Sequence, residues 1–559
     1  MKAILVATLL ACATLAGAAF AATMTWDGNG DINNSGDWNV AANWNPDQVP
    51  GDGDDVVITA VTGGSNRTIT IPAGDTVVVN SIASMGGDSA KPGIVNLQTD
   101  LTVSLTDITD NRFEFGIPAG KTLTIDNADK AVGFKILSGE GTLVKEGTGQ
   151  LAVPGLWPNW ARFTGIFWVK QGVVGGLESS DGGNFVYFGD ANLVIDDGAM
   201  VSVRSHEAAS VAASVTINGS GLAGGTGWDA DAGALRFYLD GGLETYRCDL
   251  LTVGDSGGTI GVERLWPWAA ASVEARFSTV NGNGTLSKVG ECVMTLDGAV
   301  GNAGGVVIRE GGLHLDGSTV TGDVTINMPS SPLTYDPDSI TKLTGTATIN
   351  GKLTMQDGSI LFPRQIGVGR EVTAPQQLDA GSAELGGITY EWHINDAEGA
   401  AGTNWDLLHA GTSLDITATS ADPMTIMIVS LAQTNETGPV YNFDNTQHYS
   451  WTIAQADAIT GFSANAITID TTEFQHDLGS GSFIVGAFEG QLKLRFLPTI
   501  YADVTGDCKV NILDMLAVRD HLGVPVVSGE NDVYDVTGDG KIDILDMLAV
   551  RDRLNTVCD

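Results

Sequence analysis

A long succession of short, alternating apolar segments is the feature that most constrains how this chain can fold. Between residues 22 and 498 no apolar period of 3.6 residues recurs, as an amphipathic helix would need. Runs rich in valine, threonine and isoleucine occur instead, at residues 56–59, 122–125 and 324–326 among others, and clusters of glycine, asparagine and aspartate separate them. Such runs fit half-buried strands, and the clusters fit turns. The sequence therefore predicts an all-β fold: a sandwich, a barrel or a β-solenoid.

A degenerate repeat favours the solenoid among these three. Residues 143–147 (LVKEG) return as residues 286–290 (LSKVG), each copy follows a Gly-x-Gly-Thr segment, and a strand with a glycine turn follows each. In a solenoid each repeat buries its apolar face only against its neighbours, so repetition provides the stability. The pattern resembles the autotransporter-associated β-strand repeat of large secreted bacterial proteins. That resemblance implies a right-handed parallel β-helix, which we expect over residues 22–335.

Two further stretches are similar to the same class of secreted proteins. Residues 25–51 resemble its usual opening, and residues 390–408 resemble its closing β-rich segment. A proline-containing stretch at residues 328–342 marks a boundary between the predicted solenoid and this closing segment. We therefore expect a separate β-rich block over residues 336–497.

The N-terminus predicts export from the cell. Lys2 precedes an apolar run at residues 3–15, and Ala19-Phe20-Ala21 fits a signal-peptidase site, so we expect a signal peptide over residues 1–21. Leu9-Leu10-Ala11-Cys12 also resembles a lipoprotein box, so lipidation at Cys12 stays open as an alternative to cleavage after Ala21. No later stretch is apolar enough to predict a transmembrane segment. The expected location is extracellular or at the cell surface.

The charge balance excludes one class of partner. Acidic residues number 67 and basic residues 28, which gives a net charge of −39. Ordinary nucleic-acid binding needs a basic face that displaces counterions from phosphate, and an anionic membrane surface would repel this chain for the same reason. We therefore expect no nucleic-acid partner.

A duplicated acidic segment lies at the C-terminus. Residues 503–522 read DVTGDCKVNILDMLAVRDHL, and residues 535–554 read DVTGDGKIDILDMLAVRDRL, so the copies differ at only four of 20 positions. Each copy places oxygen-bearing side chains at loop positions 1, 3, 5, 9 and 12 and an apolar residue at position 8, where two such loops pair through a short β-bridge. This spacing predicts two Ca²⁺ ions, with position 7 contributing its backbone carbonyl. The predicted metal ligands are Asp503, Thr505, Asp507, Lys509, Asn511 and Asp514 in the first loop, and Asp535, Thr537, Asp539, Lys541, Asp543 and Asp546 in the second.

A calcium loop followed by a helix, with no helix before it, resembles a type I dockerin, here over residues 498–559. The resemblance implies a small α-helical module of EF-hand type that docks to a cohesin-like protein module. Loop positions 10 and 11 contact the partner in that family, and they commonly carry hydroxyl groups. The corresponding residues here are apolar: Ile512, Leu513, Ile544 and Leu545. Thr505 and Thr537 also depart from the usual Asn or Asp at position 3.

Four cysteines remain after removal of the signal peptide, and an oxidising compartment favours two disulfides among three possible pairings. Their clustering favours Cys248–Cys292 and Cys508–Cys558. Cys508 occupies loop position 6, where glycine is usual, and dockerin-like packing implies that the first loop lies near the end of the last helix. We therefore expect a Cys508–Cys558 disulfide that joins the two ends of the module.

The sequence leaves open whether the body, by which we mean residues 22–497 before the C-terminal module, has an enzymatic activity. Residues 254–258 (GDSGG) match a serine-protease nucleophile segment, but His206, the histidine upstream, lies in an unrelated context, so we interpret the segment as a turn. Four tryptophans beside prolines either cap loops or stack on sugar rings: Trp157, Trp160, Trp266 and Trp268. We favour a non-catalytic component of an extracellular assembly. The alternative is a polysaccharide-degrading enzyme, either a glycoside hydrolase or a lyase, or a carbohydrate-binding component.

Overall fold

The computed structural model contains two compact units, Met1–Leu151 and Ala152–Asp559. The structure describes residues 22–59, 67–85, 94–103, 111–128, 131–132, 134–152, 163–175, 188–203, 211–222, 232–239, 243–264, 272–327, 341–364, 374–479, 481–498, 502–505, 509–527 and 531–556. Several predictions fall outside these ranges: the signal peptide with Cys12, Asp507, Cys508, Cys558, Trp157, Trp160, Trp266 and Trp268. No described helix is long and apolar enough to cross a membrane.

The first unit consists of short strands that pair in parallel, except for one antiparallel pair (β1 with β3) near its start, and it begins with an aromatic core. Its four-stranded sheet has the order β3 (Trp44–Asn45), β1 (Thr23–Trp26), β4 (Asp55–Thr59) and β7 (Ser81–Met85). A second sheet of five strands has the order β13 (Phe134–Ser138), β10 (Asn111–Gly116), β8 (Ile94–Leu97), β5 (Thr68–Ile71) and β2 (Gly36–Asp37). Trp26 and Trp38 are fully buried and pack edge-on against Trp44, with ring centroids 5.1 and 4.7 Å away. The tryptophans of the predicted opening segment therefore form this core.

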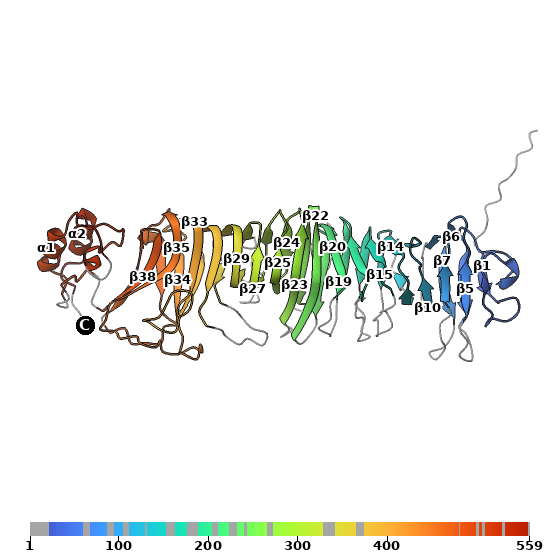
Figure 1. The fold of residues 1–559 in the computed structure, drawn as a ribbon, viewed down its shortest axis with the longest axis horizontal. Coiled ribbons are helices and arrows are strands. Elements are labelled where there is room, and N and C mark those ends of the chain that lie inside the picture. Colours follow the sequence, from blue (N-terminus) through green and yellow to red (C-terminus); the bar gives the residue numbers. More distant parts are fainter. Residues whose placement is uncertain are drawn as a thin grey trace, which may run out of the picture. The chain divides into compact units, whose positions relative to one another are not determined.

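The second unit is a long series of strands, most of them parallel, that lie side by side (Figure 1). Its strands up to residue 326 are β16 (Ile166–Val169), β17 (Gly172–Gly175), β18 (Asn192–Ile195), β19 (Ala199–Val203), β20 (Ser214–Gly219), β21 (Leu235–Leu239), β22 (Leu243–Arg264), β23 (Ser272–Gly282), β24 (Leu286–Val289), β25 (Val293–Val300), β26 (Val306–Ile308), β27 (Gly312–Val320) and β28 (Val324–Ile326). The later strands are β29 (Lys342–Met355), β30 (Ile360–Phe362), β31 (Gln377–Leu385), β32 (Thr389–Ile394), β33 (Leu407–Ile416), β34 (Met424–Ser430), β35 (Tyr449–Thr460), β36 (Ile467–Asp470), β37 (Ser482–Phe488) and β38 (Gln491–Leu497).

Stacked apolar side chains form the interior of this unit. Leu286 is in register with Val306, Val306 with Val324, and Val324 with Leu353, and each of these four side chains is at most 1% exposed. The residues next to each of these along its own strand point away from the interior, because successive side chains of a strand point to opposite faces. This alternation explains why threonine and valine recur with a period of two in the sequence.

The all-β class and the parallel pairing of strands are confirmed, but the finer architecture differs from the prediction. The sheet to which these strands belong closes on itself, as a barrel does, where we expected an open right-handed β-helix. The autotransporter-associated repeat is not confirmed. The alternating pattern requires half-buried strands and turns, but it does not specify how the sheet closes, and this accounts for the difference.

The two copies of the predicted repeat share a buried lysine. Lys145 lies in β14 (Thr142–Glu146) and Lys288 in β24, and both side chains are fully buried. The Lys145 ammonium group donates to the carbonyls of Glu146 and Gly147 at 2.6 and 2.7 Å. The Lys288 ammonium group donates to the carbonyl of Gly290, and to that of Glu310 at 2.8 Å. Each lysine therefore satisfies a carbonyl of the glycine turn that follows its strand, and Lys288 also satisfies one in the turn after β26.

The same sheet contains the strands on both sides of the predicted boundary at residues 328–342. Strand β27 lies before this stretch and pairs in parallel with β29, which begins at Lys342, and β29 pairs with β31. The series of strands ends differently, because β38 pairs antiparallel with both β35 and β37. This antiparallel ending lies directly before the C-terminal module in the chain.

The predicted Cys248–Cys292 disulfide is wrong. Both side chains are buried thiols, and no disulfide joins them. Cys248 is in register with Phe277, and Phe277 with Leu296, so Cys292 lies four residues away from that register. At about 3.3 Å per residue this offset is about 13 Å, whereas disulfide-bonded Cα atoms lie about 4.4–6.8 Å apart. Clustering in the sequence could not reveal the offset.

Candidate calcium-binding and docking module

Helices α1 (Ile512–Asp520) and α2 (Ile544–Arg551) follow the two acidic loops and begin with the same hydrogen bonds. Asn511 Oδ1 accepts from Leu513 N, and Asp543 Oδ1 accepts from Leu545 N, both at 2.7 Å. In return, the carboxylate at loop position 12 accepts from the backbone N–H at position 9, at 2.8 Å in both copies. These reciprocal bonds form a capping box, which fixes where each helix starts. Positions 9 and 12 of the predicted ligand set therefore also set the helix boundary.

The threonine at position 3 has a defined place in each loop. Thr505 donates to Asp514 Oδ1 through its backbone N at 3.0 Å and its hydroxyl at 2.8 Å. Thr537 donates to Asp546 Oδ1 in the same way, at 2.8 and 3.0 Å. Each hydroxyl therefore holds the carboxylate of position 12, and the two copies reproduce these distances to within 0.2 Å.

The two copies cross-connect through backbone hydrogen bonds. Asn555 N donates to Val510 O, and Gly523 N donates to Ile542 O, both at 2.8 Å. Position 8 of each loop is thus bonded to the segment after the other copy's helix, where we expected the two loops to pair with each other. Val510 and Ile542 do share one small core, and its members are Ala502, Val510, Val518, Val536, Ile542 and Val550. The approximate two-fold arrangement decides this pairing, because it brings each helix end beside the opposite loop.

The second loop is described completely, and it folds around the carboxylate of position 1. Asp535 Oδ1 accepts from Asp539 N at 3.1 Å, and Asp535 Oδ2 accepts from Gly540 N at 3.0 Å. Gly538 and Gly540 have φ values of +71° and +83°, a region that favours glycine. The tight turn that calcium loops need is therefore present.

The electrostatics of the second loop favour a bound cation. Burial raises the pKa of Asp535 to about 6, with nearby Asp546 and Asp539 also raising it and Arg495 lowering it. Burial also raises the pKa of Asp546, against the hydrogen bonds that it accepts. Both side chains are at most 4% exposed. Buried carboxylates that disfavour one another's ionisation gain stability from a divalent ion among them.

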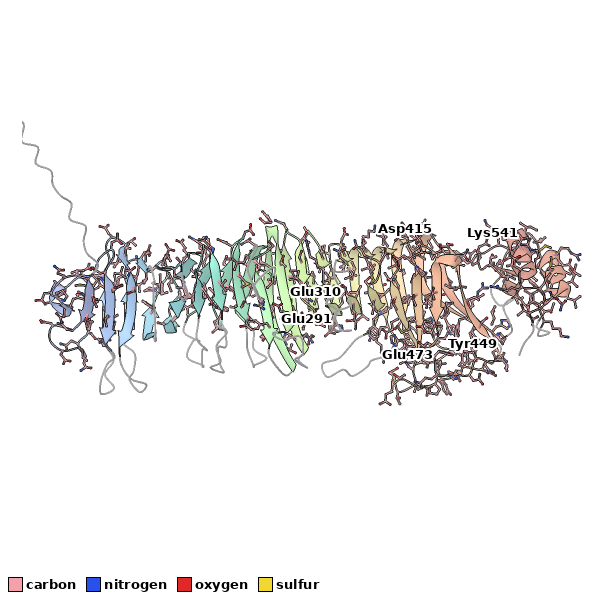
Figure 2. The ribbon with its side chains drawn as sticks, turned by 180° about the vertical axis from the view of Figure 1, so that it is seen from behind. Glu291, Glu310, Asp415, Tyr449, Glu473 and Lys541 are labelled. Atoms are coloured by element: carbon pink, nitrogen blue, oxygen red, sulfur yellow. The ribbon has the colours of Figure 1, made fainter. Side chains whose placement is uncertain are left out.

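The ligand atoms of the two loops are of the kind that Ca²⁺ prefers, but the acidic side chains are not gathered around one point as they are in a metal-bound site. Carboxylates and backbone carbonyls are the hard oxygen ligands that Ca²⁺ prefers. Across the described ranges, however, no group of three or more His, Cys, Asp or Glu side chains is gathered as a metal site would be. The buried carboxylates at positions 1 and 12 accept bonds from loop N–H groups instead, as described above. The Lys509 and Lys541 side chains are exposed, and Figure 2 shows Lys541 on the C-terminal module.

The four predicted partner-binding residues form two exposed apolar pairs. Ile512 and Leu513 begin α1, and Ile544 and Leu545 begin α2. Their exposed fractions are 58, 54, 57 and 50%. Each pair lies in the first turn of its helix, beside the predicted ligands of its loop.

The repeated loop-and-helix geometry agrees with a family comparison. Residues 501–555 match the model of the dockerin type I domain. The expectation of a dockerin module at the C-terminus is thus confirmed, and dockerin domains of this type bind calcium and dock to cohesins. No curated protein and no solved structure matched the chain in the corresponding comparisons.

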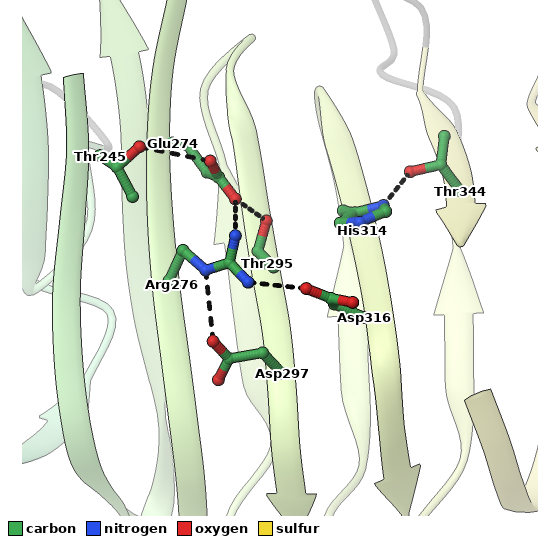
Figure 3. Close-up of polar contacts among 8 residues, drawn as sticks. All are labelled: Thr245, Glu274, Arg276, Thr295, Asp297, His314, Asp316 and Thr344. Carbon is green, nitrogen blue, oxygen red and sulfur yellow. Dashed lines mark hydrogen bonds and ion pairs between the residues drawn. The ribbon is translucent and has the colours of Figure 1, made fainter. Parts of the chain in front are cut away.

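The body contains a polar cluster that the sequence did not indicate (Figure 3). Arg276 of β23 lies 3.3 Å from Glu274, 3.2 Å from Asp297 of β25 and 2.7 Å from Asp316 of β27. The Thr295 hydroxyl donates to Glu274 Oε1 at 2.6 Å. The spacing of two residues between Glu274 and Arg276, and between Thr295 and Asp297, could have suggested that each pair shares a face of its strand. Only the register between the strands shows that the pairs lie side by side.

A second polar cluster is centred on a buried histidine. His393 Nδ1 lies 2.8 Å from Asp406 Oδ2, and His393 Nε2 lies 3.4 Å from Glu391. Burial lowers the pKa of His393, but hydrogen bonds to the two carboxylates outweigh it, so the pKa is raised. The His393 and Asp406 side chains are 2% and 0% exposed, so the pair is an internal contact of the second unit.

Proposed function

We propose that this protein is a secreted, non-catalytic component of an extracellular or cell-surface assembly, which binds two Ca²⁺ ions and docks to a cohesin-like module through its C-terminus. The observation that carries the proposal is the duplicated loop and helix start, in which both copies make the same capping and position-3 hydrogen bonds. A chance acidic turn would not reproduce these bonds twice in register. The family match over residues 501–555 supports the same function.

Calcium would be held by the predicted oxygen ligands of each loop. In the second loop these are the carboxylates of Asp535, Asp539, Asp543 and Asp546, with the Lys541 carbonyl. The ion supplies positive charge that offsets the repulsion among these carboxylates. Thr505 and Thr537 hold the position-12 carboxylates, so each positions a ligand and need not be a strong ligand itself.

Docking would use the exposed apolar pairs at the helix starts. An exposed Ile–Leu pair is stabilised by burial against an apolar surface, at about 25 cal/mol per Å² of apolar area. A partner surface suited to hydroxyl groups would not bury these side chains against apolar atoms and would not obtain this stabilisation. We therefore propose a cohesin-like partner with an apolar patch facing positions 10 and 11.

Calorimetry with a panel of cohesin modules tests this function, with calcium present and after chelation. Binding should require calcium. Because the two copies are nearly identical, a variant with all four apolar residues changed to Asp should lose binding. Val40→Asp, at a residue that is 45% exposed on the first unit, is the matched control and should bind normally. Calcium-independent binding, or equal binding by both variants, would contradict the proposal.

We also propose the Cys508–Cys558 disulfide, on the basis of described neighbours. Val510 N donates to Thr556 O at 2.9 Å, and Asn555 N donates to Val510 O. The cysteines lie two residues before Val510 and two residues after Thr556 in the sequence. Closing this loop should stabilise the module by about 4 kcal/mol. Mass spectrometry of the non-reduced C-terminal peptides should find the linked pair, and two alkylated thiols would rule it out.

The alternative of a polysaccharide-active body has a direct test. The polar clusters of Arg276 and His393 are engaged in internal bonds, which supports the non-catalytic proposal. Release of reducing sugar or unsaturated uronate from a polysaccharide panel should not exceed that of buffer alone. Release that depends on the intact protein would make the body an enzyme and leave the docking function in place.

A further inference from the structure

The second calcium loop is seated on the last hairpin of the body, and its backbone forms much of the contact. Strands β37 and β38 form an antiparallel pair with Gly486 opposite Lys493. A Cβ atom at Gly486 would lie 2.5 Å from the Gly538 carbonyl oxygen, so the two backbones touch. Gly538 occupies position 4 of the second loop. A glycine in β37 is therefore needed for this loop to approach.

A second glycine contact lies two residues further along the loop. A Cβ atom at Gly540 would lie 2.3 Å from the Phe488 ring. Gly540 occupies loop position 6, and the equivalent position of the first loop carries Cys508. The positive φ of Gly540 and its packing against Phe488 both favour glycine at this position, where the two nearly identical copies differ.

A buried arginine completes the contact. Arg495 of β38 is 8% exposed, and its Nη2 donates to the Asp535 carbonyl oxygen at 3.4 Å. A small cavity between the two parts is lined by Phe488, Lys493 and Arg495 of the body and by Val526, Asp535 and Gly538 of the module. Arg495 bonds to the backbone of position 1, and its positive charge also lowers the pKa of the Asp535 carboxylate, which accepts hydrogen bonds from the N–H groups of Asp539 and Gly540.

We propose that hairpin β37–β38 is a docking surface for the second loop and that calcium binding at this loop strengthens the docking, as a calcium-dependent latch. The proposal rests on the proposed calcium binding of the module. Gly486 and Phe488 contact the loop backbone at Gly538 and Gly540, and Arg495 donates to the Asp535 carbonyl oxygen, so these contacts hold the loop in its folded conformation. Calcium and the hairpin therefore favour the same loop conformation from different sides, and each should increase the affinity for the other.

The latch fixes the module on the body while leaving the partner surface open. Ile544 and Leu545 remain 57% and 50% exposed although their loop contacts the hairpin. A cohesin-like partner bound at these residues would then have a defined orientation relative to the β-rich block. Loss of calcium would release the module from the hairpin as well as from the partner.

Hydrogen–deuterium exchange of the full-length chain during a calcium titration tests the latch. Peptides covering residues 535–543 report on the second loop, and peptides covering residues 482–497 report on the hairpin. We expect both to gain protection at the same calcium concentration. In Gly486→Ala, the new Cβ should block docking. The second loop should then need at least about fivefold more calcium to gain the same protection, and the hairpin should no longer gain protection when calcium is added.

Gly411→Ala is the matched control, because a Cβ at this strand glycine of β33 would meet only ordinary contacts, the nearest at 3.4 Å. It should titrate as the unaltered chain does. If Gly486→Ala also titrates as the unaltered chain does, the latch is wrong and calcium binding by the loop still stands. If the second loop of the unaltered chain shows no response to calcium, the calcium function and the latch are both wrong.

Discussion

Strands β23–β31 of the body and the two loops of the C-terminal module differ in what fills their interiors. In the body, residues such as Leu286, Val306 and Leu353 stack on one another in register, so every strand is stabilised by its neighbours. In the module, a core of six residues is flanked by the buried carboxylates of Asp535 and Asp546. We therefore expect apolar burial to supply most of the body's stability and a bound cation to add to that of the module by offsetting its charge.

Calcium removal should produce the largest difference in stability between the body and the C-terminal module. With free calcium at about 1,000 times the dissociation constant, binding contributes about 4 kcal/mol per site. Chelation should therefore unfold the helices α1 and α2 while the β signal of the body persists. Circular dichroism during thermal melting, with and without chelator, measures both transitions. A module that melts at the same temperature in both conditions would remove the contrast between the regions.

Truncation of one stacked side chain should destabilise the body. Leu353→Ala removes a fully buried side chain from the ladder and should cost about 2–5 kcal/mol. Thr354, next to it, is only partly buried, so Thr354→Ala is the control and should change stability by less than about 1 kcal/mol. Denaturant unfolding of both variants gives the comparison. Equal costs would show that the ladder is not what stabilises these strands.

The buried lysine of the body should give a dependence on pH. Burial lowers the pKa of Lys288 to about 8 in the folded state, from 10.5. Between these values the unfolded chain binds more protons, so the free energy of unfolding should rise as the pH rises from about 8 to 10.5. The total is about 3 kcal/mol. Lys288→Met should lack this rise when the two proteins are compared by denaturant unfolding, and parallel pH curves would show that Lys288 does not titrate in this range.

The sequence by itself determined the elements that depend on local pattern. The alternation of residues 324–326 predicted a strand, and the structure has β28 at Val324–Ile326. The in-register duplication of residues 503–522 and 535–554 predicted two loops followed by two helices, because ligand spacing and capping depend on residues within one copy. The helix starts at Ile512 and Ile544 follow from the same capping residues.

Tertiary structure alone decided the relations between distant residues. The register between strands places the thiols of Cys248 and Cys292 far apart and brings Asp297 and Asp316 to Arg276. How the sheet closes is also a relation between strands. None of these relations follows from alternation within one strand. The two-fold packing of the module decided that Val510 pairs with Asn555 and not with the other loop. The contact of Gly540 with Phe488 likewise depends on how β37 meets the loop. In each case the energy comes from contacts between residues far apart in the chain, which a local sequence pattern does not encode.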